Sequence, residues 1–287
     1  MILIADAGST KIDWCVTTPQ GAGRCFTSDG VNALMASDSD LHTAFSYALN
    51  SLTEAPDAVY YYGAGCVDAE VCERVEMALR RVLRPSSDAV VEVYSDLLGA
   101  ARSLCGHEPG IACILGTGSN TGLYDGVGIA DSVPSLGFML GDEGSGASLG
   151  RRMINAAYRR MVPPEIAKAM EEYLGMDYGA VLRRVYSGGE RPNAFLASLV
   201  PFIAENISCD SVRRLVAEEF RSFFSRTVAA YGPASASLPI HFVGGVAVTF
   251  SDVLAQTATL LGFPNLGKIE ARPMAGLLEY HMQFSHD

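Results

Sequence analysis

The sequence contains no long apolar run, and its uninterrupted hydrophobic stretches are only a handful of residues long. A membrane-spanning helix needs roughly 20 consecutive apolar residues, so this pattern argues against a membrane protein. No basic residue precedes the apolar opening Met1–Ala5, and Asp6 interrupts it at once, which indicates a buried strand rather than a signal peptide. We therefore expect a cytoplasmic protein that does not have a membrane as its partner.

Positive charge is also scarce, since the chain has 21 Lys and Arg residues but 32 Asp and Glu residues, which gives a net charge of −11. Such a surface repels phosphate backbones, so nucleic acid is not an expected partner. A small anion can still bind wherever several backbone N–H groups converge on one point.

No pair of cysteines has the C-x-x-C spacing, and the total of seven is odd. This usage is typical of a reducing compartment, in which each cysteine is a free thiol that packs as a small core residue. A structural metal or iron–sulfur site within the chain is not expected.

What the chain does have is enough material for a large core, since 49% of its 287 residues are hydrophobic and 18% are charged. This length corresponds to about two domains or to one large α/β unit. Hydrophobic periodicity and Gly-rich turns indicate strands and helices in turn. The expected strands are 1–5, 12–17, 22–28, 58–62, 89–94, 111–115, two more up to about 131, and 240–243; the expected helices are 38–51, 67–83, 96–104, most of 144–230, 250–261 and 274–284.

A long internal repeat indicates two related halves. Ile4-Ala-Asp-Ala-Gly-Ser-Thr10 aligns with Ile114-Leu-Gly-Thr-Gly-Ser-Asn120, and each reads as a strand, a Gly-Ser turn and a second strand. We therefore expect two α/β halves with a ligand cleft between them, because small ligands usually bind where domains meet.

Three Gly-rich turns follow predicted strands and suit phosphate and nucleoside binding. In the first loop, Asp6-Ala-Gly-Ser-Thr-Lys11, backbone and hydroxyl donors accompany a lysine, and Asp6 is placed to hold a hydrated Mg²⁺. The second loop, Gly116-Thr-Gly-Ser-Asn120, offers the same kinds of backbone and hydroxyl donors but contains no acidic residue. The third turn, at Gly244-Gly245, allows a flat group to approach the backbone closely. Each turn, taken alone, is equally compatible with a plain loop.

Two acidic positions complete the set. Asp96 follows the strand at 89–94, and Asp142 lies in the turn Leu140-Gly-Asp-Glu-Gly-Ser145 before a helical segment. Each is suited to a carboxylate aimed into a cleft, and each is equally suited to capping the helix that follows it.

Together these motifs resemble the BadF/BadG/BcrA/BcrD ATPase family, and within it the N-acetylglucosamine kinases of the sugar kinase/Hsp70/actin superfamily. Leu115-Gly-Thr-Gly-Ser-Asn120 and Leu140-Gly-Asp-Glu-Gly-Ser145 are the specific parts, and the motif order covers nearly the whole chain. The resemblance implies two ribonuclease-H-like (actin-like ATPase) domains. We expect residues 1–108 with 274–287 to form one domain, and 109–273 to form the other with a helical insertion.

The resemblance further implies a kinase that uses ATP and Mg²⁺ to phosphorylate an amino sugar, namely N-acetylglucosamine to its 6-phosphate. Asp96 matches the family's catalytic base. The implied sugar ligands are Asn32, Asp96, Asn120 and Asp142; the implied nucleotide contacts are Ser9, Thr10, Lys11, Thr117, Gly118, Gly244 and Gly245, with Asp6 at the metal.

One departure affects specificity, because Leu136 stands where these kinases usually carry Trp. Two other functions stay open: an ATPase that activates a radical dehydratase through an iron–sulfur centre, and a non-catalytic sensor of ATP or sugar. The sequence also leaves the oligomeric state open, including a homodimer.

Overall fold

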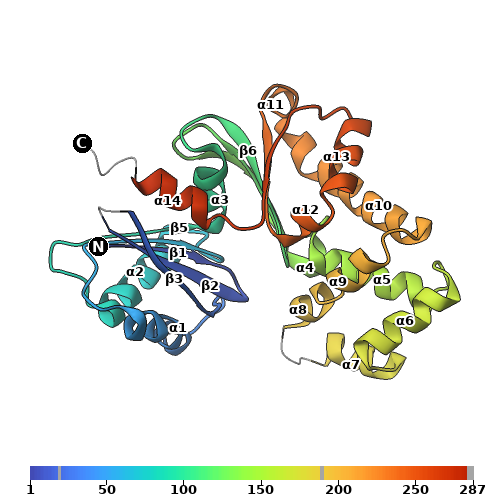
Figure 1. Cartoon of the computed structure of the whole chain (residues 1–287), viewed down its shortest axis with the longest axis horizontal. Coiled ribbons are helices and arrows are strands. Elements are labelled where there is room, and N and C mark those ends of the chain that lie inside the picture. The colour runs from blue at the N-terminus through green and yellow to red at the C-terminus, as the bar shows by residue number, and fades with distance from the viewer. Residues whose placement is uncertain (19–20, 188–190, 283–287) are drawn as a thin grey trace. The chain divides into compact units, whose positions relative to one another are not determined.

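The computed structural model describes residues 1–18, 21–187 and 191–282, and the chain divides into two compact units (Figure 1). Unit 1 consists of Met1–Glu108, Gly126–Gly128 and Arg272–Asp287, and unit 2 consists of Pro109–Asp125 and Ile129–Ala271. Unit 1 is therefore made of segments that precede and follow unit 2 in the sequence. The expected helix 274–284 is observed as α14 (Met274–Met282), and residues 283 and 284 lie outside the described residues.

Unit 1 is built on a five-stranded mixed sheet of order β3-β2-β1-β4-β5, in which β1 pairs antiparallel to β2 and parallel to β4. Its strands are β1 (Ile2–Ala7), β2 (Lys11–Thr18), β3 (Gly21–Asp29), β4 (Ala58–Gly63) and β5 (Val90–Ser95), and its helices are α1 (Asp38–Ser51), α2 (Ala69–Leu83), α3 (Asp96–Cys105) and α14.

The alternation of side chains along β1 supplies a separate core on each face of this sheet. Leu3 and Ala5 pack in the cluster that includes the α1 and α2 side chains Phe45 and Leu79. Ile4, one residue along, packs instead with Tyr62 and with Leu277 of α14. Figure 1 accordingly shows α1 and α2 on one side of the sheet and α3 and α14 on the other.

Unit 2 repeats this plan with a sheet of order β10-β9-β6-β7-β8, in which β6 pairs antiparallel to β7 and parallel to β9. Its strands are β6 (Gly110–Leu115), β7 (Ser119–Tyr124), β8 (Ile129–Val133), β9 (Ile240–Val243) and β10 (Leu266–Glu270). Its helices are α4 (Gly137–Leu140), α5 (Gly146–Tyr158), α6 (Pro164–Leu174), α7 (Tyr178–Tyr186), α8 (Pro192–Ala197), α9 (Val200–Glu205), α10 (Asp210–Arg226), the 3-10 turn η1 (Val228–Tyr231), α11 (Pro233–Ser237), α12 (Gly245–Thr249) and α13 (Ser251–Leu260).

The long helix α10 provides much of the unit 2 core. Phe220, Phe223 and Phe224 are fully buried, and the last two pack against Phe242 of β9 in tilted and edge-to-face arrangements. These aromatic contacts hold α10 against the sheet, close to the turn that carries Asp142.

The expectation that all seven cysteines are free thiols is wrong for one pair. Cys15 and Cys25 lie directly opposite each other in the antiparallel pair β2–β3 and form a disulfide, with their Cα atoms 4.1 Å apart. Alternation along each strand brings the two side chains to the same face, which the spacing of the cysteines in the sequence does not reveal.

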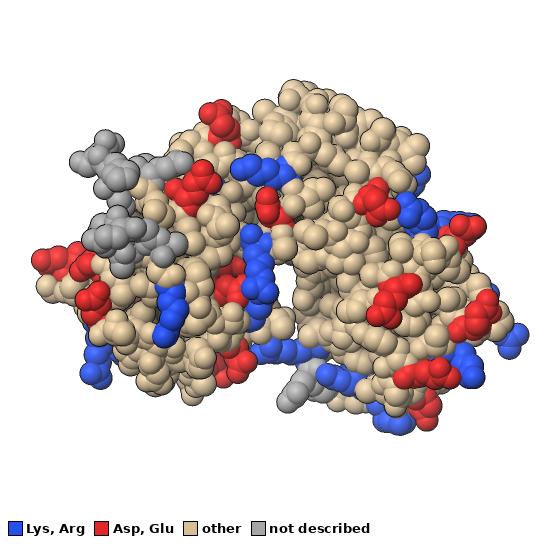
Figure 2. Space-filling model, in the orientation of Figure 1, with Lys and Arg blue, Asp and Glu red and all other residues tan. Residues whose placement is uncertain are grey.

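The surface fits the acidic composition. On the face drawn in Figure 2, acidic and basic side chains are interspersed, without a broad basic field. Within the described ranges, no helix combines the length and the apolar character that crossing a membrane requires.

Candidate active site

The first predicted loop is a tight turn between β1 and β2. The N–H of Gly8 donates to the carbonyl of Lys11 at 2.9 Å, and the N–H of Gly30 donates to the carbonyl of Thr10 at 3.0 Å. The second bond brings the segment after β3 to the loop, where the Asn32 amide donates to Ser9 Oγ at 3.4 Å. The structure thus brings together Ser9, Thr10, Lys11 and Asn32, although Asn32 is remote from the loop in sequence.

Lys11 is held by a carboxylate that we did not predict as a site residue. Its Nζ lies 2.5 Å from Asp13 Oδ2, and Asp13 also accepts a 2.8 Å hydrogen bond from Thr27 Oγ1. Arg272 lies farther away, at 3.9 Å from the same carboxylate. These partners hold the pKa of Asp13 below its usual range against the effect of its own burial. The Lys11 side chain as a whole is 45% exposed.

Asp6 lies directly opposite Asp13 in the β1–β2 pair, beside the first loop. Burial, together with the nearby negative charges of Asp13 and Asp96, raises the pKa of Asp6 to about 7 against the opposing effect of Lys11 and Arg272. Because the site is partly buried and two other carboxylates are near, the ionised form of Asp6 is unfavourable unless a cation binds beside it.

A metal ion at Asp6 would need oxygen ligands from outside the protein. Among the residues that the structure describes, no group of three or more His, Cys, Asp or Glu side chains is arranged to hold a metal. Mg²⁺ commonly binds through one or two carboxylates together with water and substrate phosphates, and the donor set at Asp6 fits that mode.

Asp96 is the first residue of α3, but it is not the helix cap. Ser95 occupies the cap position, and its Oγ accepts the N–H of Leu98 at 3.2 Å. The expectation that Asp96 is the N-cap of this helix, given as an alternative to its role in a cleft, is therefore wrong. Burial raises the pKa of Asp96, while hydrogen bonds from its own N–H and that of Leu97 oppose this rise.

The second loop, between β6 and β7 of unit 2, is fastened to the start of α5. The N–H of Gly146 donates to the carbonyl of Gly116 at 2.8 Å, and that of Ala147 donates to Thr117 at 3.1 Å. The turn Leu140–Ser145, called the acidic turn below, ends where α5 begins, so these bonds hold the second loop against it. A Cβ on Gly118 would lie only 3.1 Å from Asp142 Oδ2, so the two segments touch.

Asp142 is one of the few non-glycine residues with a left-handed backbone, at φ 56°. Its carboxylate accepts a 3.3 Å hydrogen bond from Ser135 Oγ and another from the N–H of Ser119. Burial raises its pKa, and these hydrogen bonds oppose the rise. The capping alternative is again wrong, since Ser145 caps α5 by accepting the N–H of Ser148 at 3.2 Å.

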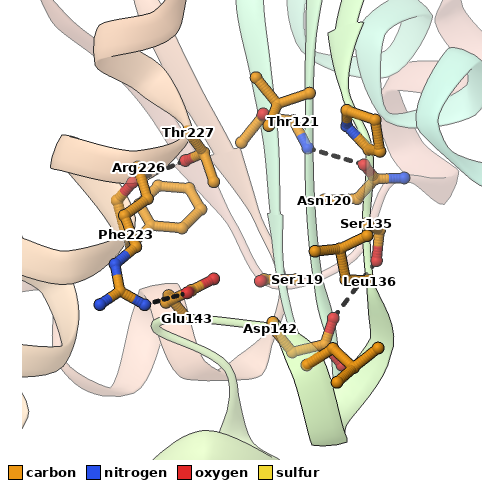
Figure 3. Close-up of a pocket in the computed structure, with 14 residues that line it drawn as sticks. Ser119, Asn120, Thr121, Ser135, Leu136, Asp142, Glu143, Phe223, Arg226 and Thr227 are labelled. Carbon is orange, nitrogen blue, oxygen red and sulfur yellow. Dashed lines mark hydrogen bonds and ion pairs between the residues drawn. The ribbon is translucent and has the colours of Figure 1, made fainter.

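Asp142 and Asn120 line a cavity of about 290 Å³ within unit 2 (Figure 3). The cavity combines hydrogen-bonding groups with apolar walls, and Leu136, one of the residues that line it, is 60% exposed. An ion pair of 2.7 Å between Arg226 and Glu143 borders the same cavity. The other lining residues are Ser119, Thr121, Val133, Pro134, Ser135, Leu140, Gly141, Phe223 and Thr227.

The third Gly-rich turn lies beside the end of β6. Gly244 has φ 128°, and a Cβ there would lie 2.2 Å from the carbonyl oxygen of Leu115, so no larger residue fits without a shift. Gly245 begins α12, and the space where its Cβ would stand is open. The structure thus places Gly244 next to the second loop and leaves room over Gly245.

Sequence reasoning therefore located two groups of residues, one in each unit. It missed Asp13 and Thr27 around Lys11, Ser135 beside Asp142, and the pair of Glu143 and Arg226. Asp13 could have been found, because residues two apart on a strand share a face.

Comparison with known proteins supplies the family. No model of a known protein family matches the chain, and no curated protein matches it. Among solved structures, a proposed N-acetylglucosamine kinase from Porphyromonas gingivalis is 38% identical, with 99% of both chains covered and a TM-score of 0.89.

More distant structures share the fold. A proposed N-acetylglucosamine kinase from Chromobacterium violaceum is 21% identical, with 97% of this chain and 98% of the other covered and a TM-score of 0.73. The MamK double-helical filament is 10% identical, with 100% and 99% covered and a TM-score of 0.59. The two mixed five-stranded sheets have the expected actin-like ATPase fold. At 38% identity over 99% of its length, the chain belongs to the family of actin-like sugar kinases, as its motifs predicted.

Proposed function

We propose that the protein is an ATP-dependent kinase of amino sugars that converts N-acetylglucosamine to its 6-phosphate. The observation that carries this proposal is the 38% identity, over essentially the whole chain, to a proposed N-acetylglucosamine kinase. The cavity beside Asp142 supports it, because carboxylate, amide and hydroxyl groups there stand beside apolar walls. Polyols need such hydrogen-bonding partners, and an acetyl methyl group needs an apolar surface.

Asp96 is the base in this proposal. The sugar hydroxyl oxygen forms a bond to the γ-phosphorus of ATP, the bond from that phosphorus to the bridging oxygen breaks, and ADP leaves. The hydroxyl proton passes to the Asp96 carboxylate. A raised pKa brings this carboxyl closer to the working pH, which improves its match to the proton that it accepts.

The remaining site residues position the two substrates. Asn32, Asn120 and Asp142 bind the hydroxyl and amide groups of the sugar. The phosphates are held by backbone and side-chain donors of the two loops, and the adenosine lies against Gly244 and Gly245. The donors to the phosphates are Ser9, Thr10, Lys11, Thr117 and Gly118.

Asp6 would hold Mg²⁺, which neutralises phosphate charge when it is bound. Without a cation, the raised pKa of Asp6 leaves its carboxyl partly protonated at neutral pH.

The test is a coupled assay of ADP release with ATP, Mg²⁺ and a panel of hexoses and amino sugars, including glucosamine without its acetyl group. We expect ADP to accumulate only in the presence of a sugar, fastest with N-acetylglucosamine. Turnover without any sugar would favour the ATPase alternative. Folded protein that binds ATP or sugar without turning either over would favour the sensor.

A further inference from the structure

Helix α10 carries a carboxylate in the middle of its apolar stripe. Val212, Leu215, Val216 and Phe220 are buried at helical spacing, and Glu219 occupies the same face with only 2% of its surface exposed. A buried carboxylate is costly unless charged and polar partners surround it, so its contacts indicate what it is for.

Two of the partners of Glu219 lie in the acidic turn or directly after it. Its Oε2 accepts the Ser148 hydroxyl at 2.6 Å and the N–H of Gly144 at 3.2 Å, and its Oε1 forms an ion pair with Arg152. Gly144 belongs to the turn that carries Asp142, and Ser148 lies in the first turn of α5, directly after it. One side chain from α10 therefore holds both ends of the junction between the turn and the helix.

The turn needs such a brace because its conformation is unfavourable. Asp142 has a left-handed backbone, which costs a non-glycine residue free energy unless its surroundings impose it. The Asp142 carboxylate is aimed by hydrogen bonds from Ser135 and Ser119, and these require the backbone of Asp142 to stay where it is. Loss of the bond to Gly144 would let the backbone of Asp142, two residues away, leave this conformation.

We propose that Glu219 is a positioning residue that holds Asp142 in its binding geometry and thereby sets the affinity for the sugar. This rests on the proposed function. Glu219 does not line the cavity, whereas Asp142 does, so Glu219 acts through the turn.

The neighbouring Glu218 provides a matched control. It lies on the same helix and shares Arg152, whose Nη1 is 3.1 Å from Glu218 Oε2, but its side chain is 52% exposed and, among the residues that the structure describes, forms no hydrogen bond or ion pair with the turn. Replacing Glu218 by Gln removes one charge beside Arg152 and leaves the brace in place.

The experiment measures kcat, the KM for sugar and for ATP, and the calorimetric Kd for N-acetylglucosamine in the wild type, Glu219→Gln and Glu218→Gln. Loss of the carboxylate weakens hydrogen bonds to a charged group, so the KM and Kd for sugar rise by about tenfold or more in Glu219→Gln. The KM for ATP stays within about twofold. A fold defect alone would instead lower the active fraction, and with it the apparent kcat, without changing either KM. All values for Glu218→Gln stay within about twofold of the wild type.

The outcomes separate the two proposals. A wild-type protein that phosphorylates no sugar overturns the proposed function, whereas an active wild type and a Glu219→Gln variant with unchanged sugar KM and Kd overturn the role of Glu219. If Glu219→Gln does not fold, Ser148→Ala decides, because it removes the 2.6 Å bond to Glu219 and leaves the carboxylate itself in place; the 3.1 Å bond that Arg151 donates to Ser148 Oγ on the same helix is lost with it. A raised sugar KM in that variant supports the brace, and an unchanged one refutes it.

Discussion

The ammonium group of Lys11 lies 2.5 Å from the carboxylate of Asp13, two residues along the same strand. Asp13 is in turn held by Thr27, so the ammonium group of Lys11 is anchored, while the Lys11 side chain as a whole is 45% exposed. This arrangement restricts the ammonium to one side of the first loop and lowers the entropy that a phosphate contact would cost.

Lys11→Ala should raise the KM for ATP by about tenfold or more and lower kcat, because a charge-assisted contact to phosphate is lost. Asp13→Asn should change the KM for ATP in the same direction but by less, since the ammonium remains and only its anchor weakens. Steady-state kinetics at saturating sugar measure both effects. A wild-type KM and kcat for Lys11→Ala would contradict the phosphate-loop assignment.

Ser95 caps α3, whereas Asp96 is the proposed base; from the sequence alone, Asp96 was a candidate for both roles. Asp96→Asn should lower kcat by at least about a hundredfold, because the base is lost. The melting temperature should stay near that of the wild type, because Ser95 caps α3. Ser95→Ala should do the reverse, with a loss of about 0.5–2 kcal/mol in the free energy of unfolding and a much smaller change in kcat. Retention of most activity by Asp96→Asn would show that the base lies elsewhere.

Asp142→Asn should act on sugar binding. Asn tolerates the left-handed backbone of this position, so the turn should survive while the charged acceptor is lost. We expect a KM for sugar raised by about tenfold or more, with a smaller change in kcat. Asp142→Ala, measured beside it, adds the strain of the turn and should also lower the melting temperature. If Asp142→Asn instead abolishes kcat at saturating sugar, Asp142 is the base rather than Asp96.

The stability of the protein should depend on pH through Asp6. Its pKa is raised from 3.8 to about 7, so between these values the folded state binds a proton more tightly than the unfolded chain. The contribution of this group to the free energy of unfolding therefore falls as pH rises from about 4 to about 7. Asp6→Asn, which has no proton to lose, should flatten that fall. Melting temperatures at several pH values measure it, with the exposed Asp88→Asn as control; curves for Asp6→Asn that run parallel to the wild type would contradict the shift.

Much of the fold could be predicted because local patterns decide it. The strand at Ile240–Val243 and the helix at Asp38–Ser51 have the bounds that periodicity indicated. Strand β10 was missed, because Gly267 and Lys268 are weak strand formers and the strand lies at the sheet edge, where one neighbour suffices.

The candidate site could be predicted only where its chemistry lies in motifs. The loops and Asp142 stood out as Gly-rich turns, whereas Asn32 needed the family resemblance. Glu219 was missed because its partners, Gly144 and Ser148, are far away in sequence. A signal was nevertheless present: a lone carboxylate at a core position of an apolar helical stripe requires a buried partner.

Helix α14 has a consequence for how the chain is made. It follows unit 2 in the sequence, yet its Leu277 packs in unit 1 against Ile4 and Tyr62, and its His281 accepts or donates a 2.8 Å hydrogen bond with Tyr62. During synthesis, the first sheet thus emerges from the ribosome well before the helix that covers one of its faces. Helix α3 reaches that face early, but the part of the face that α14 covers stays exposed while unit 2 is translated, so we expect unit 1 to complete its fold only after unit 2 has been made.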